Sequence, residues 1–400
     1  MLKKIISLSN KYEDHTINIR RKIHENPELS FQEYSTSNLV ISELESLGLS
    51  IEKNLAGTGV LATLEGHKEG KTILLRADMD ALPIEEGVDL KFKSKNLGIM
   101  HACGHDIHIS NLLGVARILS DLKDSFNGRV MFMFQPGEER GGGCKKMIKA
   151  ANLENRGIDL ALGLHIMPIE QGKILLSKGN ITAFSDGFNI KIFGRSAHTS
   201  KPQDGIDAIN IAGHIIVALN SIASKYLAPK DVASFSIGKI QGGRSNNIVA
   251  DYVELSGIIR STSQKARSIL HDKIRSISMD LTRLFAGRAE VKINIGYPSI
   301  INDPDLVTIV ENAFYKSYPD LLEDINPDFK VKDLNKYILQ HDPLLTADDF
   351  GHMSQLFPSL YYMVGTGDFA PLHSSGFLAD ERYIKLCTRT MTLAALSLLN

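Results

Sequence analysis

The chain of 400 residues lacks the features that mark several classes of protein. It has only three cysteines, Cys103, Cys144 and Cys387, and this small odd number argues against a disulfide framework and fits a reducing compartment. Lysine and arginine number 45 and aspartate and glutamate 46, so the formal net charge is −1. Such a balance provides no polybasic surface for nucleic acid or anionic lipid.

Long apolar runs are also absent. The longest, such as VMFMF at 130–134, are far shorter than the ~20 residues that span a bilayer. Lys3 and Lys4 are followed by only two strongly apolar residues, so we see no secretory signal. Apolar residues make up 43% of the chain and charged residues 23%, as in ordinary globular proteins. We therefore expect a cytoplasmic protein without nucleic-acid or membrane partners.

The chain contains instead an alternation of helical and strand-like segments. Apolar spacing predicts a helical region over 10–48, broken at Asn26-Pro27, and further helices at 106–123 and 144–151. Short apolar or alternating runs predict strands at 59–65, 72–77, 129–135 and 160–166. Buried strands that alternate with helices indicate an α/β fold with a largely parallel sheet covered on both faces.

The middle of the chain has a different order of elements. The pattern predicts strands at 184–193, 232–240, 251–260 and 289–297, with helices at 205–226 and 264–286. The order β-α-β-β-α-β is the split ferredoxin-like pattern. Because 400 residues are too many for one small core, we expect a larger domain formed by 1–183 and 298–400, with a second domain of 184–297 inserted into it.

Polar residues follow the predicted buried strand at 72–77. In the segment RADMDALP, Asp78 and Asp80 stand at the end of that strand. Ligand sites in open α/β sheets are built at the carboxyl ends of strands. An aspartate at this position is, taken alone, more typical of a turn, so these two residues gain meaning only from their neighbours.

Four potential metal ligands lie close together in MHACGHDIHIS: His101, Cys103, His105 and His108. Thiolate and imidazole suit zinc and its divalent neighbours, so this density of ligands beside a pair of aspartates favours a metal site. A different catalytic class would use Cys103 as a nucleophile, with His105 or His101 as its base. Loss of activity on chelation would separate the two schemes.

Three further segments could complete the site. Glu138 and Glu139 follow a predicted buried strand, and because they are adjacent their side chains leave in different directions. One could bind a metal while the other acts as a base, and the neighbouring Gly141–Gly143 run favours close packing. His165 ends an apolar strand and His373 lies in a late loop, and each gains weight only from the other clusters.

Taken in order, these motifs resemble the metal-dependent N-acyl-amino-acid amidohydrolases. This group contains hippurate hydrolase, plant indole-acetyl-amino-acid hydrolases and N-acetyl-diaminopimelate deacetylases, and is related to aminoacylase and carboxypeptidase G. The resemblance extends from RRKIHENPELSFQE at 20–33 to the loop of His373. It implies a three-layer α/β catalytic domain of the zinc-peptidase type and an inserted ferredoxin-like α+β domain that serves as lid and dimerisation domain.

The resemblance also implies a role for individual residues. The implied metal ligands are Cys103, His105, Glu139, His165 and His373. Glu138 would be the catalytic base and Asp80 would support a ligand histidine through its carboxylate. In the inserted domain, His198 would stabilise the oxyanion from the neighbouring subunit, and Asn247 and Arg260 would bind the substrate's α-carboxylate.

The reaction implied by this resemblance is hydrolysis of the amide bond of small N-acyl amino acids. It would use two divalent ions, zinc or manganese, with cobalt or nickel as substitutes, in a homodimer or a homotetramer. The alternatives are a dipeptidase or carboxypeptidase with the same metal site, and a binding or regulatory protein on an inactive scaffold. The chain departs from the usual pattern in QPGEER, LGLHIMP, LHSSGF and ADDFGHM, and these departures bear on the substrate rather than the reaction.

Overall fold

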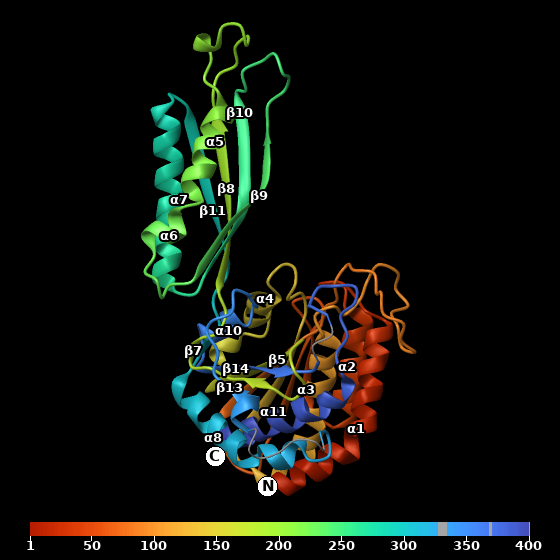
Figure 1. Cartoon of the computed structure of the whole chain (residues 1–400). Helices are drawn as coiled ribbons and strands as arrows, with labels where there is room; N and C mark the ends of the chain where they lie inside the picture. Colours follow the sequence, from red (N-terminus) through yellow and green to blue (C-terminus); the bar gives the residue numbers. More distant parts are fainter. Residues whose placement is uncertain (327–333, 368–369, 400) are drawn as a thin grey trace. The chain divides into compact units, whose positions relative to one another are not determined.

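The computed structural model describes residues 1–326, 334–367 and 370–399, and contacts divide the chain into two compact units (Figure 1). Unit 1 comprises Met1–Gly179, Ile301–Asp342 and His352–Asn400, and unit 2 comprises Asn180–Ile300 and Pro343–Gly351. The domain boundaries expected from the sequence, 183/184 and 297/298, remain predictions about where independently folding domains meet. The contacts add a short late segment, 343–351, to the second unit.

Unit 1 is built on an eight-stranded sheet with the order β1-β2-β4-β3-β5-β14-β6-β13. These strands are Ser50–Leu55, Gly59–Glu65, Thr72–Asp78, Arg129–Gln135, Leu160–Met167, Ile174–Leu175, Ile338–Leu339 and Ser359–Gly365, for β1 to β6, β13 and β14 in chain order. The central strands β4, β3, β5 and β14 run parallel, whereas β1 and β2 form an antiparallel edge. The predicted α/β class with a largely parallel sheet is confirmed.

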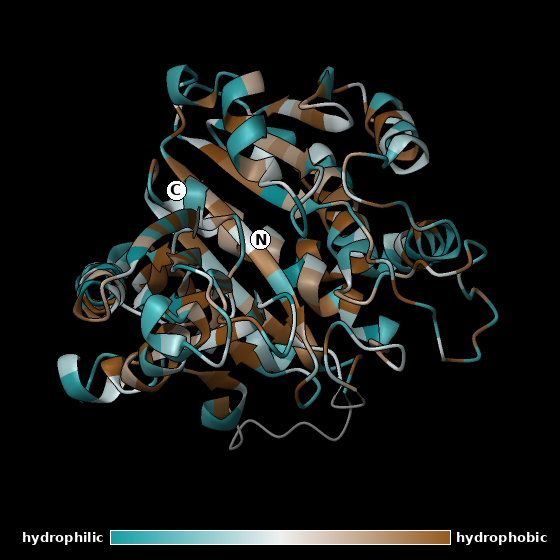
Figure 2. Cartoon of the chain, turned by 90° about the horizontal axis from the view of Figure 1, so that it is seen from above, coloured by the Kyte–Doolittle hydropathy of each residue, from teal (hydrophilic) through white to brown (hydrophobic). Residues whose placement is uncertain are grey.

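The helices of unit 1 pack on this sheet and on one another. The longer ones are α1 (Leu2–Glu25), α2 (Tyr34–Ser46), α3 (His105–Asp121), α4 (Gly143–Ala150), α8 (Pro304–Leu322) and α11 (Ile384–Leu399). Helices α3 and α11 contact β3 and β5, and α1 packs against both helices. The strands carry the most hydrophobic stretches and many helices alternate between polar and apolar residues (Figure 2), as expected for helices with one buried face. Helices α3 and α11 differ, because nearly all of their residues are buried.

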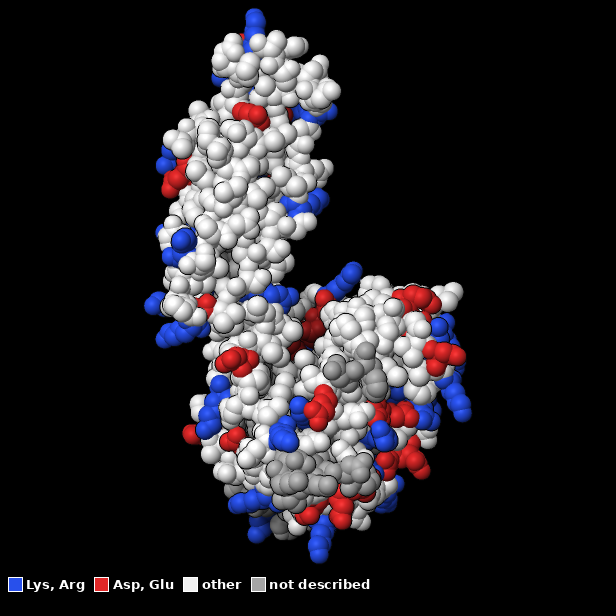
Figure 3. Space-filling model, in the orientation of Figure 1, with Lys and Arg blue, Asp and Glu red and all other residues white. Residues whose placement is uncertain are grey.

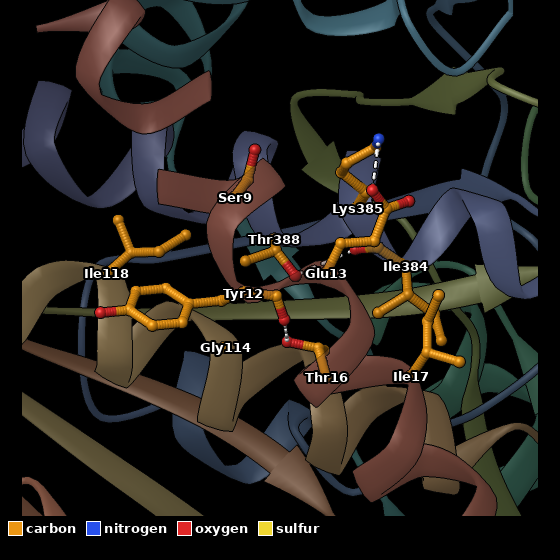
Figure 4. Close-up of a pocket in the computed structure, with 10 residues that line it drawn as sticks. All are labelled: Ser9, Tyr12, Glu13, Thr16, Ile17, Gly114, Ile118, Ile384, Lys385 and Thr388. Carbon is orange, nitrogen blue, oxygen red and sulfur yellow. Dashed lines mark hydrogen bonds and ion pairs between the residues drawn. The ribbon is translucent and has the colours of Figure 1, made fainter. Parts of the chain in front are cut away.

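The junction of α1, α3 and α11 is tightly packed. Gly114 of α3 allows this approach, because a Cβ there would lie 3.2 Å from Oγ1 of Thr16 and from Cγ2 of Thr388. The pocket that remains has a volume of about 10 Å³, and the ion pair between Lys385 and Glu13 forms part of its lining (Figure 4). A space of this size holds at most about one water molecule, so it is a packing gap and no ligand site.

Unit 2 has a four-stranded antiparallel sheet with the order β11-β8-β10-β9. Its elements are β8 (Phe184–Phe193), α5 (Ala208–Leu219), α6 (Ile222–Tyr226), β9 (Ala233–Gly242), β10 (Tyr252–Ser261), α7 (Gln264–Leu284) and β11 (Arg288–Tyr297). The apolar residues that alternate along β8 form the core of this unit with the inner faces of α5 and α7. The expected β-α-β-β-α-β order is therefore present.

Two predicted helices were wrong in extent. The first helix starts at Leu2 rather than at residue 10 and ends at Glu25, before Asn26-Pro27. The segment 205–226 is interrupted, because Asn220 ends α5 and Ser221 precedes α6. Amide and hydroxyl side chains compete with the helix for main-chain hydrogen bonds, and here Asn220 Nδ2 and Ser221 Oγ both donate to carbonyls of the preceding turn.

The surface agrees with the balanced composition. On the face shown in Figure 3, basic and acidic side chains are interspersed. Among the described helices, none is both long enough and apolar enough to cross a membrane.

Candidate metal centre

The candidate residues of unit 1 gather where four neighbouring parallel strands end. Asp78 is the last residue of β3, the Glu138–Glu139 pair follows β4, His165 lies near the end of β5, and His373 follows β14. The register places Asp78 opposite Gln135 and His165 opposite Met363. Because parallel strands present their carboxyl ends at one edge of the sheet, residues that are far apart in sequence meet there.

Cys103 and His105 reach this edge through a tight turn at the start of α3. Gly104, between them, has φ of +80°, which side-chain-bearing residues rarely adopt. A Cβ at Gly104 would also lie 2.3 Å from Cδ1 of Ile166 on β5. The turn therefore requires glycine both for its backbone conformation and for close packing on the neighbouring strand.

The five expected ligands form one cluster. Sγ of Cys103 lies 3.6 Å from Nε2 of His165 and 3.3 Å from Nε2 of His373. Oε1 of Glu139 lies 3.1 Å from Nε2 of His373 and 4.0 Å from Nε2 of His105. Donor atoms of Cys103, His105 and His165 lie within 4.8 Å of one another, as do those of Cys103, Glu139 and His373.

Hydrogen bonds to the main chain orient two of the histidines. Nδ1 of His105 donates to the carbonyl of Asp80 over 2.8 Å, and Nδ1 of His165 donates to the carbonyl of Ile166. In both rings the proton is thereby placed on Nδ1, and the Nε2 lone pair faces the cluster. Fixing the tautomer through the second nitrogen is how metal-binding histidines are commonly held.

The cluster fits a bound cation. Nε2 of His105 and Oε1 of Glu139 are buried, and neither makes a hydrogen bond among the described residues, although Oε1 lies at ion-pair distance from Nε2 of His373. Leaving such groups buried and unsatisfied is costly, and a cation between them would remove that cost. The donor set of one thiol, three imidazoles and a carboxylate is that of zinc and its divalent neighbours. His373, with φ of +61°, adopts the strained backbone that is often found at functional sites.

The protonation of Cys103 depends on such a cation. Burial raises the pKa of the Cys103 thiol far above its ordinary value, more than the neighbouring His105 lowers it. A thiol in this environment stays protonated at neutral pH unless a cation stabilises the thiolate. This property argues against Cys103 as an activated nucleophile and suits a metal ligand.

Asp80 supports the cluster in a way that differs from the expectation. The contact with His105 is made mainly by the Asp80 carbonyl, while its carboxylate oxygen lies 3.5 Å from the ring nitrogen. The Asp80 carboxylate accepts hydrogen bonds from the main-chain N–H groups of Glu138 and Glu139, each over 3.0 Å, and from Oγ of Ser30 over 2.6 Å. Asp80 thus connects the metal-ligand turn to the Glu138–Glu139 loop.

Asp78 and His108 form a second buried pair beside the cluster. Nδ1 of His108 donates to Asp78 over 2.6 Å, and Nε2 of His108 accepts the N–H of Ile166 over 3.0 Å. Both nitrogens of His108 are thus occupied, so it is not available as a ligand. Burial by itself would raise the pKa of Asp78, but the charge of Arg76, whose Nη1 lies 2.6 Å away, and the two neighbouring histidines hold it well below its usual range.

His101, the remaining candidate of this segment, is buried outside the groups of possible ligands. Burial lowers its pKa to about 3, so the ring is neutral at physiological pH. Neither of its ring nitrogens has a hydrogen-bond partner in the described part of the chain. The structure gives it no contact that would let it act as a base for Cys103.

The motif at 20–33 supports the site through residues to which the sequence assigned no role. Nε of Arg20 and Nδ1 of His24 lie 2.7 and 2.8 Å from the carboxylate of Asp106, the residue after His105, and Nε2 of His24 lies 3.0 Å from Glu86. Burial alone would raise the pKa of Asp106, but the charges of Arg20 and His24 hold it far below its usual range. This buried network fixes the first turn of α3 against α1.

Glu33, at the end of the same motif, holds the loop that carries the two glutamates. It accepts hydrogen bonds from the N–H of Gly137 over 2.9 Å and from Oγ1 of Thr58. Burial raises the pKa of Glu33 despite these bonds. The spacing within 20–33 gave no sign of this role, because Gly137, whose loop Glu33 holds, lies 104 positions later in the chain.

The candidates of unit 2 lie on two paired segments. His198 pairs with Ile248 in an isolated antiparallel bridge, and the N–H of Thr199 donates to the carbonyl of Asn247 over 3.3 Å. The exposed ring of His198 accepts the N–H of Ser200 at Nδ1 over 3.1 Å. With Nδ1 as acceptor, a neutral ring carries its proton on Nε2, which can donate outward.

Arg260 is not brought together with His198 and Asn247 within one chain. Asn247 precedes β10 and Arg260 is its ninth residue, so the strand separates them by about 26 Å at the usual rise per residue. Arg260 Nη1 donates to the carbonyl of Leu345 over 2.9 Å, and burial lowers the pKa of this guanidinium. A single subunit therefore cannot bind one carboxylate with both Asn247 and Arg260.

Known proteins are similar to this chain in both sequence and fold. It is 38% identical over 398 residues to thermostable carboxypeptidase 2 of Saccharolobus solfataricus, covering 97% of this chain and 96% of that protein. It is 35% identical over 373 residues to N-acetyl-L-cysteine deacetylase of Bacillus subtilis, covering 93% of this chain and 85% of that protein. A solved dinuclear metal-binding peptidase of the M20 family from Bacillus subtilis matches with a TM-score of 0.82 and 30% identity, over 98% of this chain and 99% of that one.

The sequence profile of peptidase family M20/M25/M40 matches residues 74–397, which include the five clustered donors and Glu138. The resemblance found in the motifs is confirmed by this match and by the relatives. The chain belongs to peptidase family M20/M25/M40 and is a metal-dependent hydrolase.

Proposed function

We propose that this hydrolase cleaves the amide bond of N-acyl amino acids and releases a carboxylic acid and a free amino acid. The observation that carries the proposal is the convergence of five donor side chains beside Glu138 at the carboxyl ends of β3, β4, β5 and β14. The deacetylase relative, whose name describes an N-acetyl amino acid, supports the choice of substrate class.

Two divalent cations would be held by Cys103, His105, Glu139, His165 and His373. Two of the donor triads share Cys103, as suits a centre for a pair of ions. When bound, such cations acidify the attacking water and polarise the scissile carbonyl. The thiol favours zinc by its softness, while manganese is the alternative, since affinity order alone does not decide which metal a protein holds in the cell.

Glu138 is the residue that we assign to proton transfer. Its side chain is buried, and its carboxylate lies within 4.8 Å of the donor atoms of His105 and Glu139. Its main-chain N–H is held by Asp80 over 3.0 Å, so its position is tied to the ligand turn. From there it would accept a proton from the attacking water and pass it to the nitrogen of the leaving amine.

His198, Asn247 and Arg260 are assigned to the substrate. His198 would donate from Nε2 to the oxyanion that develops on the carbonyl, and Arg260 would bind the α-carboxylate with its planar fork. Because Asn247 and Arg260 lie at opposite ends of β10, we assign His198 and Asn247 of the partner subunit to the active site that uses Arg260.

Unit 2 has the features of a surface that joins two subunits. β9 lies at an edge of the sheet, and edge strands readily pair with another chain. Ile240 on β9 and Ile209 on the neighbouring α5 are 57% and 51% exposed, and Val217 of α5 is 75% exposed. Large exposed apolar side chains that gather on β9 and α5 favour an interface. We propose a homodimer formed through unit 2.

A mixture of two inactive variants tests the contribution of the partner subunit. We expect His198→Ala and Glu138→Gln each to be nearly inactive, and mixed subunits to regain activity, since a hybrid dimer has one site with both residues intact. Activity should be measured after the variants are unfolded and refolded together, with separately refolded variants mixed afterwards as the control. If mass spectrometry shows hybrid dimers and activity does not return, His198 does not act across subunits.

A substrate panel tests the proposed function itself. We expect hydrolysis of N-acetyl, N-benzoyl, indole-acetyl or long-chain N-acyl amino acids, measured as released amino acid on samples whose metal content is known. The carboxypeptidase relative favours a second candidate, cleavage of a carboxyl-terminal peptide bond, so peptides with the same terminal residue belong in the panel. Turnover of the peptides with none of the acyl amino acids would replace the proposal by that alternative.

A further inference from the structure

A pocket of about 220 Å³ adjoins the metal-ligand cluster within unit 1. Its walls include the side chains of Leu29, Phe31, Leu82 and Pro83, and Glu139, one of the clustered donors, forms part of its lining. Arg140 also lines it, and this residue is exposed. Ser30 and Gln32 complete the lining with Ala81, so the pocket is largely but not wholly apolar. Its charged side chain Arg140 reaches solvent, and the candidate metal centre lies beside it.

The walls of this pocket are held in place by hydrogen bonds. The segment that carries Leu29 forms a parallel bridge with Ala81, whose N–H donates to the carbonyl of Glu28 over 2.8 Å. Ser30, the next residue, donates to Asp80 over 2.6 Å. The residues that shape the pocket are therefore fixed to the same aspartate that positions Glu138 and Glu139.

The ring of Phe31 explains why glycines stand at positions 137 and 141, on either side of the two glutamates. A Cβ at Gly137 would lie 2.4 Å from the Phe31 ring and a Cβ at Gly141 would lie 2.8 Å from it, so the ring packs directly on the loop. Nζ of Lys146 lies 3.8 Å from the centre of the same ring. Phe31 has φ of +63°, an uncommon conformation for a large residue that persists only where the surroundings enforce it. The pocket is a preformed part of the structure.

The size and polarity of the pocket indicate one arm of a substrate. Clefts that take a whole drug-sized ligand measure roughly 300–1,000 Å³, so 220 Å³ suits a single group. We propose that this pocket binds the acyl group of the substrate and that it favours a phenyl-sized apolar acyl group over acetyl. This inference rests on the proposed function, because it assigns the acyl half of an N-acyl amino acid to the pocket.

Filling the pocket tests the inference. Leu29 is only half-buried, so Leu29→Trp can be accommodated in the fold while its larger side chain occupies the space. We expect kcat/KM for an N-benzoyl amino acid to fall by about 10–200-fold, with that for the N-acetyl derivative of the same amino acid changed by less than about threefold. Leu39→Trp is the matched control, since Leu39 of α2 is also half-buried but does not line the pocket.

Two further measurements keep the test decisive. Leu29→Ala, which enlarges the pocket, should also lower the benzoyl-to-acetyl ratio, because apolar contacts are lost without any bulky insertion. An equal loss for both substrates, or an unchanged ratio in both variants, would overturn the inference. The inference would also be overturned if the Leu29 variants changed the preference among substrates that share one acyl group and differ in the amino acid. In that case the pocket would bind the amino-acid half of the substrate.

Failure of the proposed function has a separate signature. In that case the wild-type enzyme hydrolyses neither acyl substrate. The pocket is then tested by measuring the binding of benzoate alone with ligand-observed NMR. Binding to the wild type and to Leu39→Trp, with loss in Leu29→Trp, supports an apolar pocket whatever the reaction. Equal binding to all three proteins, or to none, rules against it.

Discussion

Glu138→Gln is expected to lower kcat by about 10²–10⁴-fold, the usual contribution of general acid–base catalysis, while the metal content of the protein stays unchanged. The substitution keeps the size of the side chain but removes its capacity to take up a proton. The main-chain hydrogen bond from Glu138 to Asp80 does not involve the side chain, so the loop should stay in place. Steady-state kinetics and metal analysis on one preparation measure both quantities.

Glu139→Gln is the matched control for this result. The two residues are adjacent and their N–H groups are held by the same carboxylate, so the variants differ only in which side chain is altered. Oε1 of Glu139 faces His105 and His373, and we therefore expect Glu139→Gln to lose metal together with activity. Near-normal turnover in Glu138→Gln, or loss of metal from it, would show that the two roles are assigned wrongly.

Much of the framework could be predicted because it depends on local patterns. Apolar patterns in the sequence predicted strands at 129–135 and 184–193, and these ranges are those of β4 and β8 in the structure. The polar residues that follow β3, β4 and β5 could be expected to meet, since parallel strands end at one edge. The parallel strand β14, which carries the chain toward His373, was not predicted, although SLYYMVG is entirely buried.

Contacts between distant segments could not be read from the sequence. Asp80 was expected to orient a ligand histidine through its carboxylate, but its carbonyl makes that contact and the carboxylate holds two main-chain N–H groups. Only the three-dimensional path of the loop decides which of its oxygens faces which partner. The same holds for Glu33 and Gly137, which are joined across 104 positions.

The separation of Asn247 and Arg260, by contrast, follows from the sequence prediction itself. A strand over 251–260 was expected, and it lies between them. An extended strand of that length cannot bring its two ends to one carboxylate. The assignment of both residues to one substrate therefore needs a second subunit, whereas the five metal ligands need only one chain.

Removal of divalent metal is expected to abolish activity and to lower the thermal stability of the protein. Nε2 of His105 is buried with no hydrogen-bond partner in the described residues, and Oε1 of Glu139 has there only its ion-pair contact with His373, so the fold without cations keeps poorly satisfied groups in its interior. A ligand that binds only the folded state stabilises it by about 2.7 kcal/mol at a hundredfold excess over its Kd. Exhaustive chelation followed by calorimetry and an activity assay measures both effects, and zinc, manganese or cobalt should restore them.

Cys103→Ala should reproduce the effect of chelation without a chelator. Sγ of Cys103 lies within 3.6 Å of the Nε2 atoms of His165 and His373, so its loss removes the atom that the two donor triads share. Cys387→Ala is the control, because Cys387 is also buried but lies on α11 away from the cluster, and this variant should keep its metal. A protein that stays active after prolonged chelation, yet loses activity in Cys103→Ala, would instead identify the thiol as a nucleophile, against the direction in which burial shifts its pKa.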